Sequence, residues 1–435
     1  MSEFLDQPGM MTLTPLTTIA SVSLTNRELQ TKPELQLLLY CLRSSIDDGT
    51  AESIKRLLVE QDIDWTYLLK TARRQKVLPL LYHSLKNTCP DLVPQNILKQ
   101  LRNYFQHLVV HNTFLTEKLL KLLTLLEKHG ISAIPFKGAT LAVSVYGNLG
   151  LRQFGDLDIL VDQHDIPTVK ELLLSQGYEL QKDLGWEYHF VDKKSRVCID
   201  LHEGIVPDLF CLPLDFDYLR SHLEPLSLAG KTVSTISPEQ MLLILCVQLG
   251  KDCCHWSVRL AQLCDVAELI RTHPQLDWRR VLAEAQKLGC ERMLLLDLCL
   301  VRDLLGVTLP QIVLNKLQAQ PLCQSLALQV RSQLFRDFEE APKLSEPQGF
   351  WVFFLSYNHR FYFRIRERFH DKVMYCLYWL KNILLVTLMP NEADWELLSL
   401  PRVLAFLYYP IHIIRLLIKH GIQPIFRTHH EPHSL

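Results

Sequence analysis

Apolar residues recur at intervals of three and four between about residues 35 and 128. A clear example is the series Leu115, Leu119, Leu122, Leu123 and Leu126. This spacing places apolar side chains on one side of an amphipathic helix, and Lys128 followed by Gly130 suits a helix end. Residues 1–30 are rich in Ser, Thr and Pro and lack the repeat, so they are predicted to form a flexible tail.

Short apolar runs replace the helical repeat between residues 131 and 236. The predicted strands are Ile131–Phe136, Leu157–Val161, Tyr188–Val191 and Arg196–His202. Helices are predicted for the ATLAVSVY segment after Gly138 and for Pro167–Gln176, which stops at Gly177. The order strand, helix, strand, helix, strand, strand is typical of an α/β or α+β unit.

Helical spacing returns after Ser237, which precedes Pro238 and Gln240 in a capping-box arrangement. The predicted helical stretches are Met241–Val247, Ser257–Ile270, Trp278–Leu288 and Arg292–Leu305. The chain therefore divides into a tail (1–30), a helical region (31–130), an α/β core (131–236), a helical region (237–345) and an aromatic, basic helical region (346–435). The predicted fold class is α+β, a small mixed sheet with helices inside a mainly helical protein.

Two apolar stretches near the C-terminus raise the question of a membrane. Val373–Met389 contains Lys381, and Val403–Ile418 contains Pro410 and Arg415. Neither supplies the roughly 20 uncharged residues of a spanning helix. Buried or amphipathic helices are the favoured interpretation, with peripheral membrane contact as the alternative.

Composition and charge limit the partners and the cellular compartment that the sequence favours. The formal net charge is −1, so no global charge attracts nucleic acid or acidic lipid. None of the 12 cysteines forms a CxxC pair, which argues against a zinc module and a secreted disulfide framework. The first ten residues lack the basic start of a secretory signal. These features favour the cytoplasm.

Carboxylates alternate along two of the predicted strands. In the run from Phe154 to Val161, Asp156 and Asp158 share one face of the strand. Asp200 and His202 share a face of the later strand. If the two strands are neighbours, three carboxylates converge and can bind two Mg²⁺ ions, which assist displacement at phosphorus. His202 either orients a ligand or is a hydrogen-bonded structural residue.

Lys137 and Gly138 end one strand and open a helix, which directs backbone N–H groups toward an anion. Gly138 permits close approach of a phosphate, Lys137 supplies positive charge, and Arg152 supplies a second charge with fork geometry. For Arg152 a salt bridge to the acidic cluster is the alternative. The later group His255, Trp256, Arg259 and Asp265 is better explained by helix packing and capping.

The segment FKGATLAVSVYGNLGLRQFGDLDILV, with the later IDLH, resembles a bacterial family of uncharacterised nucleotidyltransferases. That family lies within the superfamily that includes DNA polymerase beta. The resemblance covers about residues 35 to 310 and is sharpest between 134 and 202. The superfamily usually has Gly-Ser or Gly-Gly where this chain has Lys137-Gly138, so the serine that would contact a phosphate is absent.

This resemblance implies Mg²⁺ ligands at Asp156, Asp158 and Asp200, with Asp200 as ligand or base. It places Lys137, Gly138 and Arg152 on the phosphates of a nucleoside triphosphate. The expected reaction transfers a nucleoside monophosphate to a hydroxyl acceptor and releases pyrophosphate. The near-neutral charge favours a small molecule, sugar or protein acceptor over a long nucleic acid. The alternative is a non-catalytic nucleotide-binding, regulatory or adaptor protein on the same fold.

Overall fold

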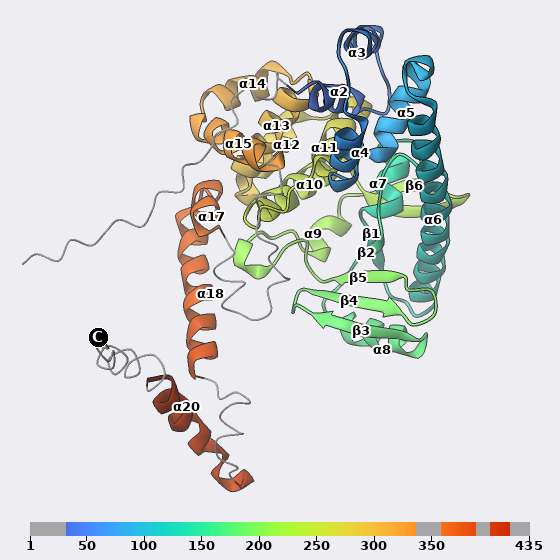
Figure 1. The fold of residues 1–435 in the computed structure, drawn as a ribbon. Helices are drawn as coiled ribbons and strands as arrows, with labels where there is room; N and C mark the ends of the chain where they lie inside the picture. The colour runs from blue at the N-terminus through green and yellow to red at the C-terminus, as the bar shows by residue number, and fades with distance from the viewer. Residues whose placement is uncertain (1–31, 336–357, 389–400, 418–435) are drawn as a thin grey trace, which may run out of the picture.

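Residues 133–202 of the computed structural model form a five-stranded mixed sheet (Figure 1). The structure describes residues 32–335, 358–388 and 401–417, so the predicted tail lies outside the described residues. The strands are β1 (Ala133–Pro135), β2 (Asp156–Val161), β3 (Tyr178–Asp183), β4 (Glu187–Asp192) and β5 (Cys198–His202). Their order is β1-β2-β5-β4-β3, in which β2 and β5 run parallel and the other pairs are antiparallel.

The structure confirms the four predicted strands and adds three. β3 was missed because its sequence, YELQKD, is polar and mostly exposed. The hairpin of β6 (Leu223–Leu228) and β7 (Lys231–Ile236) was also missed. Its turn places Ala229 and Gly230 at φ of 49° and 79°. Both values lie in the left-handed region that a two-residue hairpin turn requires, and Ala-Gly is a weaker sequence signal than Asn-Gly.

Three helices cover the apolar face of the sheet. They are α6 (Gln95–Lys128), α7 (Gly138–Ser144) and α8 (Ile166–Ser175). Leucines of α6 form one buried cluster with Leu157, Ile159, Ile199 and Leu201 of β2 and β5. Because side chains alternate along a strand, the aspartates between these residues point to the other face.

A second, larger apolar core joins the N-terminal helices with those that follow the sheet. The N-terminal set is α2 (Pro33–Cys41), α3 (Asp48–Glu60), α4 (Trp65–Arg74), α5 (Leu78–Thr88) and the short η1 (Pro90–Leu92). The later set is η2 (Asp208–Phe210), α9 (Phe216–Arg220), α10 (Pro238–Cys253), α11 (Leu260–Thr272), α12 (Trp278–Leu288), α13 (Glu291–Leu305), α14 (Gln311–Gln318) and α15 (Pro321–Leu334). The predicted helices are confirmed, as is the α+β class with its small mixed sheet. All twelve cysteines are free thiols, mostly buried.

The described C-terminal helices are α17 (His359–Ile365), α18 (Phe369–Leu388), the short η4 (Arg402–Leu407) and α20 (Tyr408–Leu417). Tyr375 and Trp379 of α18 are buried, whereas Phe369, Leu377 and Leu380 on the same helix are exposed. Among the described residues, no helix combines the length and apolar character needed to cross a bilayer.

Candidate active site

Three aspartates meet on the polar face of the sheet. β2 and β5 are parallel neighbours, and their register sets Asp158 opposite Asp200 and Asp156 opposite Cys198. Asp156, Asp158 and Asp200 all line one cavity of about 640 Å³, which we call the aspartate cavity. All three predicted aspartates therefore line the same cavity, on two neighbouring strands.

The pKa values of Asp156 and Asp158 are shifted in opposite directions within this cavity. Burial, followed by the neighbouring Asp158 and Asp200 carboxylates, raises the pKa of Asp156 to about 6. Burial acts in the same direction on Asp158, but Lys137 and His202 outweigh it and hold the pKa of Asp158 well below its usual range. Buried carboxylates that repel one another are a suitable donor set for a hard divalent cation, because the cation removes the repulsion.

Lys137 and His202 both face Asp158. Lys137 follows β1, and its Nζ lies 4.0 Å from Asp158 Oδ1. Nε2 of the buried His202 lies 3.4 Å from the same oxygen, and its ring packs edge-on against Phe136. Neither ring nitrogen of His202 makes a hydrogen bond within the described part of the chain. His202 is thus a buried group directed at the carboxylate.

Gly138 is not among the residues that line the aspartate cavity. Its φ of +46° lies in the left-handed region. A Cβ there would meet the backbone oxygen of Asp156 at 3.5 Å and the ring of Phe154 at 3.6 Å. Gly138 therefore lets the chain turn out of β1 in close contact with the start of β2.

Arg152 lines the cavity, but its guanidinium is bound to a carboxylate of α11. Nε and one terminal nitrogen each donate to Asp265 at 2.9 Å, and Tyr146 donates its hydroxyl to the same carboxylate at 2.8 Å. Burial lowers the pKa of Arg152, but Asp265 outweighs burial and raises it above the usual range. A salt bridge was the alternative interpretation of Arg152, and its partner is Asp265 rather than the aspartates of β2.

β4 adds two side chains beside Asp200 that the sequence analysis did not select. His189 Nδ1 lies 2.7 Å from Asp200 Oδ1, and His189 Nε2 lies 3.3 Å from Glu187 Oε1. Glu187, His189 and Asp200 are the one trio, among the described residues, whose potential metal-binding atoms all lie within 4.8 Å of one another. Glu187 and His189 share one face of β4, but Glu187 lies one residue before the predicted strand Tyr188–Val191.

Residues 61–306 match the family described as uncharacterised nucleotidyltransferases. The chain belongs to this family. The match begins after α3 and runs from α4 through the sheet to α13, so it includes every residue of the aspartate cavity. A search among curated proteins finds no match.

Solved structures similar to this nucleotidyltransferase match only part of it. A lincosamide antibiotic adenylyltransferase with lincomycin bound is 18% identical, with a TM-score of 0.27, over 35% of this chain and 94% of that one. The antibiotic-resistance factor ANT(2'')-Ia is 9% identical, with a TM-score of 0.33, over 40% of this chain and 93% of that one. A nucleotidyltransferase-like protein from Paracoccidioides brasiliensis is 15% identical, with a TM-score of 0.29, over 52% of this chain and 96% of that one.

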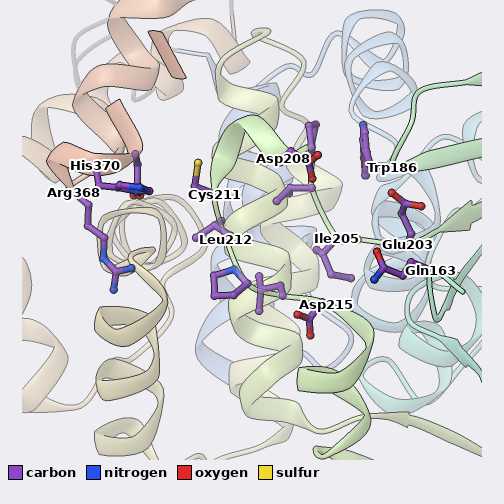
Figure 2. Close-up of a pocket in the computed structure, with 16 residues that line it drawn as sticks. Gln163, Trp186, Glu203, Ile205, Asp208, Cys211, Leu212, Asp215, Arg368 and His370 are labelled. Atoms are coloured by element: carbon purple, nitrogen blue, oxygen red, sulfur yellow. The ribbon is translucent and has the colours of Figure 1, made fainter. Parts of the chain in front are cut away.

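A second cavity of about 650 Å³ adjoins the aspartate cavity through Trp186, whose side chain lines both. Figure 2 shows Trp186 and Glu203 on one side of this second cavity, and Arg368 and His370 on the opposite side, where α18 begins. The nucleotidyltransferase thus has two neighbouring cavities with one aromatic side chain between them. Nothing in the local sequence around Trp186 indicated this position.

Proposed function

We propose that this protein is a Mg²⁺-dependent nucleotidyltransferase that moves a nucleoside monophosphate from a nucleoside triphosphate to a hydroxyl acceptor. The observation that carries the proposal is the meeting of Asp156, Asp158 and Asp200 in one cavity on the polar face of the sheet. Family membership supports the reaction type. The metal, the roles of individual residues and the acceptor are the proposed parts.

Asp156, Asp158 and Asp200 would hold two Mg²⁺ ions, which supply charge neutralisation at the reacting phosphate and its leaving oxygen. The acceptor oxygen attacks the α-phosphorus, the bond from that phosphorus to the bridging oxygen breaks, and pyrophosphate leaves. Asp200 would take the hydroxyl proton, and His189 would fix its orientation through the 2.7 Å contact. His202 would act on Asp158 as a buried polar neighbour, with its Nε2 3.4 Å from Asp158 Oδ1.

Lys137 is proposed to contact the phosphates, because its ammonium lies at the edge of the carboxylate group and lines the cavity. Gly138 contributes indirectly, since its left-handed backbone turns the chain so that Lys137 faces the cavity. Arg152 supplies a fixed positive charge behind the aspartates while Asp265 holds its guanidinium. Gly138 and Arg152 were predicted to bind the nucleotide. We now propose that Gly138 orients Lys137 and that Arg152 contributes charge without contacting the phosphates.

The acceptor is proposed to enter through the second cavity. Trp186 lines both cavities, and its ring lies 5.8 Å from that of His202, which in turn contacts Asp158. A molecule in the second cavity is therefore one side chain away from the reacting phosphate. Carboxylates of Glu203, Asp208 and Asp215 line this cavity and can accept hydrogen bonds from hydroxyl groups.

A direct test uses purified protein, Mg²⁺ and each of the four α-³²P-labelled nucleoside triphosphates. Two acceptor sources are supplied separately, a protein-free small-molecule extract and a heat-treated protein fraction. Wild type should transfer label and release pyrophosphate. Asp158→Asn should reduce both by about a hundredfold or more, because a metal contributes several kcal/mol to such a displacement.

Asp162→Asn provides a matched control, since Asp162 follows β2 directly but pairs with His164 outside the aspartate cavity. It should transfer label as wild type does. Equal transfer by wild type and Asp158→Asn would contradict the proposal. Nucleotide binding without any transfer, and independent of Mg²⁺, would favour the non-catalytic alternative.

A further inference from the structure

The aspartate cavity receives positive charge from outside the sheet. The lysine and arginine side chains that line it are Lys76, Lys137, Arg152, Lys251 and Arg259. Three of these have a carboxylate close by: Lys137 with Asp158 at 4.0 Å, Arg152 with Asp265 at 2.9 Å and Lys251 with Asp252 at 3.7 Å. Lys76 and Arg259 have no carboxylate within ion-pair distance among the described residues, so their charge is available to a ligand.

Lys76 is held in an unfavourable backbone conformation. It closes α4 with φ of 57°, and the N–H groups of Lys76 and Val77 bond back to the oxygens of Arg73 and Ala72, a helix ending that costs a non-glycine residue free energy. Its neighbour Gln75 is buried and fixes this turn. The Gln75 side chain accepts from Leu260 N at 2.9 Å and donates to Leu334 O at 2.8 Å, and its backbone oxygen accepts from Ala261 N at 3.2 Å.

The same contacts bring Lys76 and Arg259 together. Arg259 immediately precedes α11, whose first two N–H groups bind Gln75, so the two cations come from adjacent turns at the cavity. Partial burial, then Arg259, lowers the pKa of Lys76, whereas Asp156 acts to raise it. Two like charges held beside one another are stabilised when an anion lies between them.

We propose that Lys76 and Arg259 bind the β- and γ-phosphates of the nucleoside triphosphate. This inference rests on the proposed function, because the α-phosphorus must then lie at the aspartates, where Lys137 already supplies a cation. Lys76 and Arg259 come from helices outside the sheet and face the remaining phosphates. The helical regions before and after the sheet would thus together select a triphosphate over a monophosphate.

The experiment compares dissociation constants of the full chain by isothermal titration calorimetry. The ligands are Mg²⁺ complexes of α,β-methylene analogues of the four triphosphates and the corresponding monophosphates. The variants are Lys76→Asn, Lys76→Arg and Arg259→Gln. Lys55→Gln, at an exposed position of α3, controls for loss of one positive charge.

Lys76→Asn and Arg259→Gln should each weaken triphosphate binding about tenfold or more, the usual effect of losing a hydrogen bond between charged groups, and leave monophosphate binding unchanged. Lys76→Arg and Lys55→Gln should bind as wild type does. Asparagine tolerates the left-handed backbone, so the melting temperature of Lys76→Asn should equal or exceed that of wild type. This separates a binding role from a structural one.

Wild-type triphosphate affinity in both Lys76→Asn and Arg259→Gln would overturn this inference and leave the proposed function intact. An equal loss of monophosphate affinity would also overturn it, because the two side chains would then contact the α-phosphate or stabilise the fold. Failure of the wild type to bind any triphosphate with Mg²⁺ would overturn the proposed function together with this inference.

Discussion

Arg152 lies at the proposed site, yet its hydrogen bonds go to Asp265 on a distant helix. The two side chains form a two-bond pair, and both are largely buried. Removing one member of such a pair leaves a buried charge without compensation, which is more costly than removing both. Arg152 is therefore expected to affect stability more directly than nucleotide contact.

The substitution Arg152→Met should lower the free energy of unfolding by about 3–5 kcal/mol, because it leaves the buried Asp265 carboxylate without its cationic partner. The double variant Arg152→Met/Asp265→Leu should lose less, since no isolated charge remains. Urea denaturation followed by circular dichroism measures both. Wild-type stability in Arg152→Met, combined with lost nucleotide affinity, would instead make Arg152 a direct phosphate ligand.

At the scale of elements, α6 positions the loop that leads into β2. The buried Asn112 of α6 donates its side-chain N–H groups to the backbone oxygens of Leu149 and Arg152 at 2.6 and 2.8 Å. Gly150 lies between these two points. A Cβ at Gly150 would come within 2.6 Å of Val109 Cγ2 and 2.8 Å of Phe105 Cζ. The loop can approach the helix only because this position is glycine.

Gly150→Ala should therefore destabilise the fold by about 1–3 kcal/mol, the usual cost of overpacking. Gly155→Ala is the matched control for stability, because nothing lies within 4 Å of its added Cβ. Thermal unfolding of the two variants side by side makes the comparison. Equal melting temperatures would mean that the loop and α6 separate more easily than their packing indicates.

The strands that carry the aspartates were predictable because alternation along a single strand is a local property of the sequence. Asp156 and Asp158 could be assigned to one face of their strand, and Asp200 to the polar face of its own, without knowing the fold, whereas the pairing of the two strands could not. Lys76 and Trp186 could not be found in this way. They reach the site through contacts with residues far away in the sequence, such as the bond from Leu260 to Gln75, and no local spacing records such contacts.

At the scale of the whole molecule, the large helical core contains an ionisable group that bears on stability. Asp297 of α13 is fully buried beside Cys246 of α10, and burial raises its pKa well above the usual value. The folded state thus keeps a proton that the unfolded chain releases near pH 4. Stability from this group is present below that pH and is lost as pH rises toward the folded-state pKa.

Asp297→Asn removes this titration, so its melting temperature should exceed that of wild type by a margin that grows between pH 5 and pH 8. Asp303→Asn, at an exposed acid on the same helix, should show no such growth. Differential scanning fluorimetry across this pH range measures the effect. A margin that shrinks with rising pH would contradict the buried, protonated state of Asp297.

The central claim is that three carboxylates on β2 and β5 hold divalent metal for the transfer of a nucleotide. Electron paramagnetic resonance with Mn²⁺ in place of Mg²⁺ counts bound ions directly, in the presence of an α,β-methylene nucleoside triphosphate. We predict two Mn²⁺ ions per chain for wild type and fewer for Asp158→Asn, with Asp162→Asn equal to wild type. The same number of bound ions in wild type and Asp158→Asn would contradict the account.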